Sequence, residues 1–294
     1  MSREQKEGQV GKLPARPSWL RLSPRLMQVA AFVPDGSRMA DIGTDHGYVP
    51  IYLASMGKIK AALAMDVGEG PLKRAAEHIR EYEQWAAETG LPSLCPIQTR
   101  LSDGLKGLKP GEVDAVVMAG MGGELEIRIL EEGRHMWDSV SHWILSPQSD
   151  LHKVRMFLED NGFAIEDEAM VKDEGKYYTI LDVTRGAMSY LRPIWYRYGK
   201  VLLERRDGIL KEYLEKEQAR VQGILEHFGA QEPEVPKEMD QAWDDIREMD
   251  RIQARDQSGI MARTAPPMTE AQARARTALM EELGWIKEAQ DEMQ

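Results

Sequence analysis

The chain has 294 residues, with 49 acidic and 38 basic side chains, a formal net charge of −11 and a single cysteine, Cys95. This charge argues against nucleic-acid binding driven by bulk charge, though it leaves room for local basic patches, and one cysteine excludes an internal disulfide and a cysteine metal cluster. No run approaches the roughly 18 apolar residues of a membrane span, and the polar N-terminus lacks a signal-peptide core, so we expect a cytoplasmic protein of one or two domains.

The N-terminal part predicts an arm followed by a helix. Residues 1–18 are polar and contain several Gly and Pro residues, which is typical of a disordered arm. Apolar residues between Trp19 and Phe32 recur at helical spacing, and Ser23 followed by Pro24 is a typical helix start. The turn at 34–36 then leads into the first strand.

The segment 39–51, MADIGTDHGYVPI, predicts a buried strand, a turn with Gly43 and Gly47, and a helix that opens at Tyr48. Such a unit forms the ligand crevice of an open α/β sheet. The glycine spacing is not that of a dinucleotide fingerprint, and the acids Asp41 and Asp45 would repel a pyrophosphate. Carboxylates favour a ligand with an amine and a sulfonium, so S-adenosylmethionine fits better than NAD. An ordinary turn with solvated acids is the alternative.

A second apolar run over 61–65 predicts a strand that ends at Asp66, 25 residues after Asp41. Nucleotide-binding α/β folds place an acid at a similar offset, roughly 20 residues, where it accepts hydrogen bonds from ribose hydroxyls. A helix over 71–87 and a third strand over 96–100 follow. The next turn offers Ser102, Asp103 and Gly104 as contacts for an adenine ring, although Ser-Asp-Gly is also a common turn.

The run 113–118 is continuously apolar, which predicts a central parallel strand. It ends in the glycine cluster 119–123, where Gly120 and Gly122 permit close backbone approach, and a helix begins at Glu124. We then predict a strand over 142–145, a helix over 151–161, and a hairpin of strands over 163–170 and 177–184. Seven strands with a final hairpin match a class I methyltransferase sheet.

Beyond residue 186 the pattern becomes helical, over 201–228, 239–255 and 269–292. We therefore predict a methyltransferase domain over 19–186 and a helical domain over 187–294. Cations and aromatic residues alternate at the start of the helical part, as in proteins that bind RNA phosphates and unpaired bases. The candidate cations are Arg192, Arg197, Lys200, Arg205 and Arg206, and the N-terminal part adds Arg16, Arg21 and Arg25. Packing at the domain junction is the alternative explanation for the aromatic residues.

Seven colinear blocks of this sequence resemble the tRNA (adenine-22-N1)-methyltransferase family. They are LSPRL at 22–26, ADIGTDHGYVPIYL at 40–53, the segment 66–71, RLSDGL at 100–105, MAGMGG at 118–123, LSPQSDLHKVRMFL at 145–158 and GKYY at 175–178.

The resemblance implies a cytoplasmic bacterial enzyme with a Rossmann-like, seven-stranded class I methyltransferase domain and a coiled-coil-like C-terminal domain. It implies methylation of N1 of adenine 22 in the D-loop region of tRNA, with S-adenosylmethionine as methyl donor, no metal and no obligate protein partner. The implied cofactor contacts are Asp41, Gly43, Asp45, His46 and Gly47 on the methionine side, Asp66 at the ribose, Ser102, Asp103 and Gly104 at the adenine, and Gly120, Met121 and Gly122 along the cofactor. Pro147 and Gln148 lie in the loop implied to meet the substrate base, although the order Ser-Pro-Gln-Ser departs from the family's Gln-Pro-Asn-like loop.

The chemistry of this reaction suits these residues. N1 lies on the Watson–Crick edge, so the adenine must be unpaired, and its ring lone pair can attack the methyl group in line without a strong base. Asp45 is the candidate for stabilising the positive charge that develops on the ring. His46 would orient Asp45 or relay a proton, or is a structural turn residue; Tyr48 would stack on the base or pack in the core. A methyltransferase for a small molecule or a protein, and a non-catalytic cofactor-binding protein, are the alternatives.

Overall fold

The structure is a computed structural model that describes residues 17–229 and 269–294. Contacts divide the chain into two compact units, the first ending at Leu210 and the second spanning Lys211–Glu292. This division falls later than residue 186 because α6 (Pro193–Tyr198) and α7 (Lys200–Glu204) pack on elements of the first unit. The domain boundary after residue 186 stays a prediction. Of the predicted arm over 1–18, all but residues 17 and 18 lie outside the described residues.

The first unit contains a single seven-stranded sheet with the strand order β3-β2-β1-β4-β5-β7-β6. Its strands are β1 (Arg38–Ile42), β2 (Ala61–Asp66), β3 (Ile97–Leu101), β4 (Ala115–Ala119), β5 (His142–Ser146), β6 (Phe163–Asp173) and β7 (Lys176–Arg185). Strands β1 to β5 pair in parallel, and β7 runs antiparallel to both β5 and β6. This confirms the predicted Rossmann-like sheet with its final hairpin. The strand order reverses between β1 and β4, and ligands of open α/β sheets bind at such a switch point.

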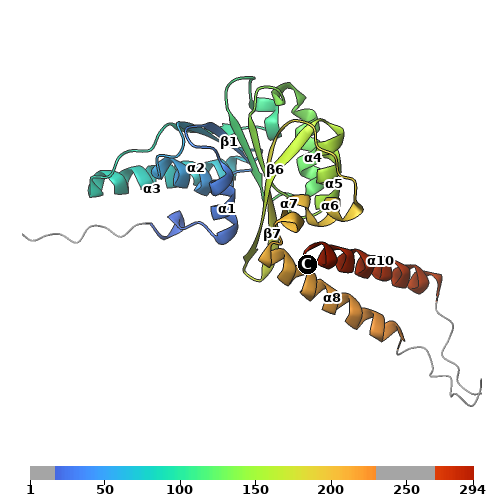
Figure 1. Cartoon of the computed structure of the whole chain (residues 1–294). Coiled ribbons are helices and arrows are strands. Elements are labelled where there is room, and N and C mark those ends of the chain that lie inside the picture. The colour runs from blue at the N-terminus through green and yellow to red at the C-terminus, as the bar shows by residue number, and fades with distance from the viewer. Residues whose placement is uncertain (1–16, 230–268) are drawn as a thin grey trace, which may run out of the picture. The chain divides into compact units, whose positions relative to one another are not determined.

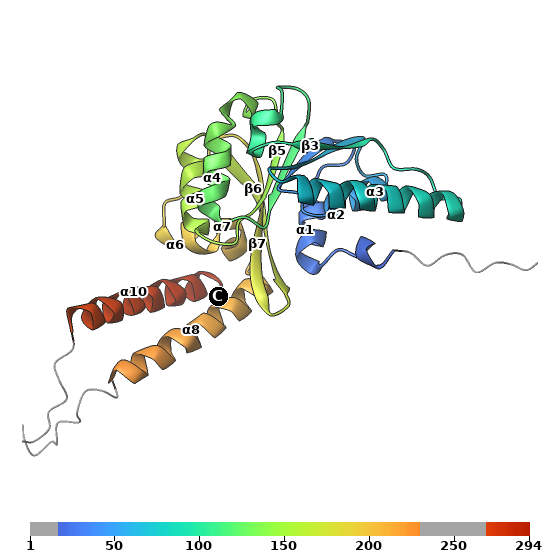
Figure 2. The same cartoon turned by 180° about the vertical axis from the view of Figure 1, so that it is seen from behind.

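Helices cover both faces of the sheet (Figures 1 and 2). One face carries α1 (Pro24–Phe32), α2 (Tyr48–Ser55) and α3 (Glu69–Thr89), and the other carries α4 (Gly123–Glu132) and α5 (Leu151–Asp160). Side chains alternate along β1: Met39 packs in the core beneath α1 and α2, whereas Ala40 and Ile42 pack in the core beneath α4 and α5. By the same alternation Asp41 belongs to the α1–α2 face.

The expectation of one helix over 201–228 is wrong. The helix α7 ends at Glu204, and α8 (Gly208–Gly229) begins after a break in which Arg206 has a φ of 52°. Asp207 Oδ1 accepts hydrogen bonds from the backbone N–H groups of Ile209 and Leu210, both at 2.9 Å. This side-chain cap satisfies donors that a new helix start leaves unpaired, so it competes with continuation of the helix.

The second unit pairs most of α8 with α10 (Glu270–Glu292). Arg220 forms an ion pair with Glu282 at 2.7 Å, and Gln290 Nε2 donates to Gln218 Oε1 at 2.9 Å. The predicted helix over 239–255 lies outside the described residues, and a coiled coil stays a prediction. Among the described helices, none combines the length and hydropathy that a membrane span needs.

Candidate active site

A cavity of about 240 Å³ lies at the switch point, at the carboxyl ends of β1 and β4 and beside the first turns of α1 and α2. Its lining consists of Arg25, Leu26, Asp41, Gly43, Thr44, Asp45, His46, Gly47, Tyr48, Val49 and Ala119. The fold therefore brings together all the residues that were expected around the first strand–turn–helix unit.

The turn after β1 needs its glycine at position 43. Gly43 has a φ of +77°, and the backbone N–H groups of Gly43 and Thr44 both donate to the Met65 carbonyl, at 2.8 and 2.9 Å. A Cβ at Gly43 would meet only the flexible end of the Met121 side chain, so the positive φ is the reason for glycine here. Glycine thus allows the turn in which both N–H groups reach β2.

Asp41 is a buried residue, only 8% exposed. Burial raises the pKa of Asp41 to about 6, and the neighbouring Asp66 carboxylate acts in the same direction. At neutral pH this carboxylate is ionised in poorly hydrated surroundings, so a cation bound in the cavity would interact with it more strongly than in water.

Asp45 lies on the exposed side of the cavity and has a partner that sequence reasoning missed. Its Oδ1 forms an ion pair with Nη2 of Arg74 in α3, and its Oδ2 lies 3.3 Å from His46 Nε2. Arg74 is far from Asp45 in the sequence, and only the packing of α3 beside the turn brings them together. The negative charge of Asp45 is therefore partly compensated in the described structure.

His46 and Tyr48 form a group of near-parallel rings with His78 of α3. The ring centroids lie 4.9 Å apart for His46 and Tyr48, 5.4 Å for His46 and His78, and 5.2 Å for Tyr48 and His78. His78 Nδ1 lies 2.9 Å from the His46 carbonyl oxygen. Burial raises the pKa of the Tyr48 hydroxyl. Tyr48 thus both packs against neighbouring rings and lines the cavity.

The candidate ribose and adenine contacts follow β2 and β3. Asp66 Oδ1 accepts a hydrogen bond from the Gly68 N–H at 2.7 Å. The Ser102 hydroxyl accepts from the Gly107 N–H at 2.9 Å and so holds its own loop. Asp103 pairs with Lys106 at 2.6 Å, and this interaction lowers the pKa of Asp103.

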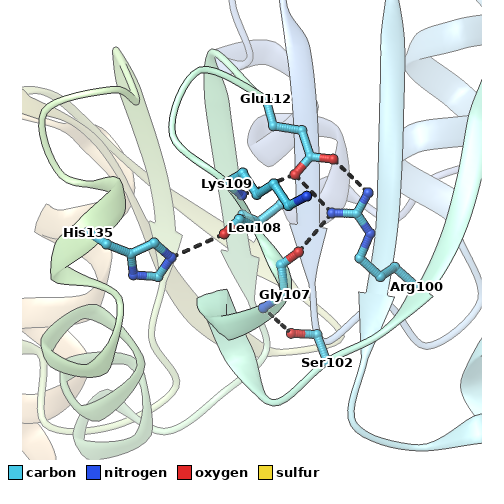
Figure 3. Close-up of polar contacts among 7 residues, drawn as sticks. All are labelled: Arg100, Ser102, Gly107, Leu108, Lys109, Glu112 and His135. Atoms are coloured by element: carbon cyan, nitrogen blue, oxygen red, sulfur yellow. Dashed lines mark hydrogen bonds and ion pairs between the residues drawn. The ribbon is translucent and has the colours of Figure 1, made fainter.

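Arg100 braces the loop that carries Ser102, Asp103 and Gly104 (Figure 3). The Arg100 guanidinium donates to both carboxylate oxygens of Glu112, at 2.6 and 2.9 Å, and to the Gly107 carbonyl at 2.8 Å. Such a fork-to-carboxylate pair fixes geometry as well as charge. The loop conformation is therefore set by contacts within the protein.

The glycine cluster after β4 meets the loop after β5. Gly120 has a φ of +102°, and a Cβ there would lie 3.5 Å from Arg25 Nη1 and 3.8 Å from Gln148 Nε2. The Gln148 N–H donates to the Met121 carbonyl at 2.7 Å. Gln148, with Pro147 before it, thus lies next to the segment expected to run along the cofactor, and Gly122 directly precedes α4.

The five candidate RNA-binding cations between residues 192 and 206 do not line this cavity; they lie on α6 and α7 or directly beside them. Arg205 forms an ion pair with Asp167 at 2.5 Å, and Lys200 Nζ lies 3.7 Å from Glu204. The aromatic residues of this segment are packed to different degrees: Tyr190 and Tyr198 are buried, and Trp195 and Tyr196 are half-buried. For them, packing describes the structure better than an open stacking surface.

Arg25 lines the cavity, whereas the sequence placed it only among N-terminal cations that could meet RNA. It lies in the first turn of α1. A positive charge there opposes the helix dipole, and this unfavourable placement is the sequence signal that could have marked it.

Residues 22–181 match a family model described as a methyltransferase domain. The chain is 36% identical over 167 residues to the tRNA (adenine(22)-N(1))-methyltransferase of Bacillus subtilis, a match that covers 57% of this chain and 66% of that protein. It is 28% identical over 155 residues to a putative tRNA methyltransferase of Mycoplasma pneumoniae, covering 51% of this chain and 66% of that protein. The matched part thus spans just under two thirds of the length of these curated relatives.

Solved structures match over more of the chain. A putative tRNA (m1A22) methyltransferase of Streptococcus pneumoniae is 30% identical, with a TM-score of 0.69 and coverage of 92% of this chain and 99% of that one. A structure of that protein in complex with S-adenosyl-L-methionine gives 29% identity, a TM-score of 0.67 and coverage of 92% and 99%. The m1A22 tRNA methyltransferase of Bacillus subtilis is 26% identical, with a TM-score of 0.65 and coverage of 92% of this chain and 99% of that one.

Proposed function

This chain belongs to the methyltransferase domain family, whose model matches residues 22–181, and we propose that it is an S-adenosylmethionine-dependent enzyme that methylates N1 of adenine 22 in tRNA. The observation that supports the proposal most is the match to the Streptococcus pneumoniae structure, which extends over 92% of this chain and so includes its C-terminal helical part. We further propose that the enzyme acts in the bacterial cytoplasm, where its tRNA substrate is found.

The cavity fits S-adenosylmethionine on its own chemistry. When bound, this cofactor supplies an electrophilic methyl group on a positively charged sulfur. Asp41 and Asp45 present carboxylates suited to its ammonium and sulfonium charges, and Gly43 and Gly47 let the backbone of the turn come close. In the proposed complex Asp66 accepts hydrogen bonds from the ribose, and the loop of Ser102, Asp103 and Gly104 lies at the adenine. Gly120, Met121 and Gly122 lie along the cofactor.

The proposed reaction asks the protein mainly to position its substrate. The adenine leaves its pairing partner, and its N1 lone pair, aligned with the methyl group, is the nucleophile. No base is required because N1 carries no proton. Asp45 stabilises the positive charge that develops on the ring, with His46 at 3.3 Å to orient it. Tyr48, Pro147 and Gln148 hold the target base. The five cations on and beside α6 and α7, from Arg192 to Arg206, contact tRNA phosphates.

The test is mass spectrometry of tRNA nucleosides from a strain with and without the gene, with the purified full chain added back in vitro. We expect 1-methyladenosine to be lost on deletion and restored by the purified chain on a tRNA transcript, but not on the same transcript with guanine at position 22. Methylation of a small molecule or a protein instead would contradict the tRNA assignment. Cofactor binding with no methyl transfer to any of these would contradict the enzymatic assignment.

A further inference from the structure

Arg25 is a half-buried cation with one nitrogen left unpaired. Its backbone N–H donates to Asp173 Oδ2 at 3.3 Å, and its guanidinium carbon lies 5.1 Å from the ring centroid of Tyr178. Asp173 and Tyr178 belong to the β6–β7 hairpin, which therefore holds the arginine in place. Nη1 is buried, yet within the described residues it has no hydrogen-bond partner. A buried donor without a partner is costly, so it points to a ligand group that completes the site.

The charged side chains that line the cavity are separated by sign. Among the described residues that line the cavity, Arg25 is the one arginine or lysine. Its Nη1 lies 3.5 Å from the place of a Cβ at Gly120, at the end of β4. Asp41 and Asp45 lie at the end of β1 and in the turn after it. The cavity thus offers a cation beside β4 and carboxylates beside β1.

We propose that Arg25 binds the α-carboxylate of the methionine part of S-adenosylmethionine. This inference rests on the cofactor named in the proposed function, whose amino-acid end carries an ammonium and a carboxylate on one carbon. The two acids suit the ammonium and the sulfonium, and a guanidinium matches a carboxylate through two parallel hydrogen bonds.

A tRNA phosphate is the competing ligand for this cation. The surroundings of Arg25 favour the cofactor, because Asp41 and Asp45 in the same cavity would repel an approaching polyanion. The guanidinium is also only partly exposed and stacked on Tyr178, whereas cations that contact a tRNA surface need broad exposure.

The test is calorimetric titration of the full chain, without tRNA, with S-adenosylmethionine and with its decarboxylated form, which lacks only the α-carboxylate. Wild type should bind S-adenosylmethionine roughly 10-fold to 100-fold more tightly than the decarboxylated form, the range for a charge-assisted hydrogen bond. Arg25→Gln should lose this preference, because it should weaken binding of S-adenosylmethionine and leave binding of the decarboxylated form unchanged. Arg25→Lys, which keeps the charge but not the two-pronged geometry, should lose part of it.

Arg21→Gln is the matched control, because it removes the same charge from an exposed position four residues earlier. It should keep the full preference, and thermal unfolding of each variant reports whether α1 still packs. An unchanged preference in both Arg25→Gln and Arg25→Lys would overturn the inference, and a raised KM for tRNA in these variants would then assign Arg25 to a phosphate. Wild type that binds neither compound would overturn the proposed function and this inference with it.

Discussion

Asp41 is buried, and this burial raises the pKa of its carboxyl group to about 6. In the unfolded chain an aspartate has a pKa of about 3.9, so the folded state binds this proton more tightly. The ionised Asp41 side chain therefore lowers the free energy of unfolding above about pH 6, and this loss of stability fades as the pH falls toward 4. A residue kept at this cost is consistent with a role in binding a cation.

We therefore expect Asp41→Asn to raise the free energy of unfolding by up to about 3 kcal/mol at pH 8 and by little near pH 4, while it weakens binding of S-adenosylmethionine. Urea unfolding at the two pH values measures the first effect, and calorimetry the second. Asp35→Asn, in an exposed turn, is the control and should change neither quantity. A gain in stability of the same size at both pH values would show that the pKa of Asp41 is not raised.

Asp45 differs from Asp41 because its side chain is 63% exposed and already pairs with Arg74. Stabilisation of charge in a shielded site is worth a factor of about 100 or more in rate, and solvent reduces it. We expect Asp45→Asn to lower kcat by about 10-fold to 100-fold and to weaken cofactor binding much less than that, and His46→Ala to lower kcat less. Single-turnover methylation with cofactor and tRNA both saturating measures this. A rate within a few-fold of wild type would remove Asp45 from the chemical step.

At the scale of elements, one buried ion pair ties α5, β6 and α6 together. Arg155 and Glu168 have fully buried side chains, with Nε and Oε1 3.2 Å apart. Arg155 Nη1 also donates to the carbonyls of Tyr196 and Arg197, at 2.9 and 3.1 Å. Burial raises the pKa of Glu168, and the Arg155 charge opposes that shift.

We expect Glu168→Leu to lower the free energy of unfolding by about 3–5 kcal/mol, because it leaves a buried guanidinium without its counter-charge. The double variant Arg155→Met, Glu168→Leu should recover only part of this, since two carbonyls of α6 then lose their donor. Asp114→Asn is the control: its partner Arg38 is exposed, so the loss should stay below about 1 kcal/mol. Urea unfolding measures these changes, and similar losses of stability for Glu168→Leu and Asp114→Asn would contradict the expectation.

The elements that sequence reasoning predicted are those whose signals are local. The apolar runs ending at Asp41, Asp66 and Ala119 became β1, β2 and β4, because burial of such runs and the turns after them depend on neighbouring residues. Contacts between distant residues were not predictable: the charge of Arg25 in a first helical turn could mark it as unusual, but no pattern in the sequence places it beside Gly120 or places Arg74 beside Asp45. These pairs depend on how α3 and α1 dock on the sheet. The break before α8 was missed because helical periodicity runs through Asp207, whose side chain caps instead.

At the scale of the whole molecule, a chain with a net charge of −11 must meet a polyanion through local clusters of cations. The candidate cluster contains Arg192, Arg197, Lys200, Arg205 and Arg206. Because Arg205 already pairs with Asp167, its replacement would expose a carboxylate as well as remove a cation. A change at Arg205 would therefore alter two charges at once, so the test below leaves Arg205 unchanged.

We expect the triple variant Arg192→Gln, Arg197→Gln, Arg206→Gln to raise the KM for tRNA and to flatten its dependence on salt, by roughly 0.7–0.9 in log–log slope for each phosphate that the protein no longer neutralises. Cofactor affinity should stay the same, since none of the three lines the cavity. Arg38→Gln is the control, because Arg38 lies at the amino end of β1, at the opposite end of the strand from the cavity, and, like Arg205, it pairs with a carboxylate, that of Asp114. If the salt dependence of KM is unaltered in the triple variant, other cations bind the tRNA. The salt dependence of a variant with Arg16 and Arg21 replaced would then decide whether the N-terminal part supplies those cations.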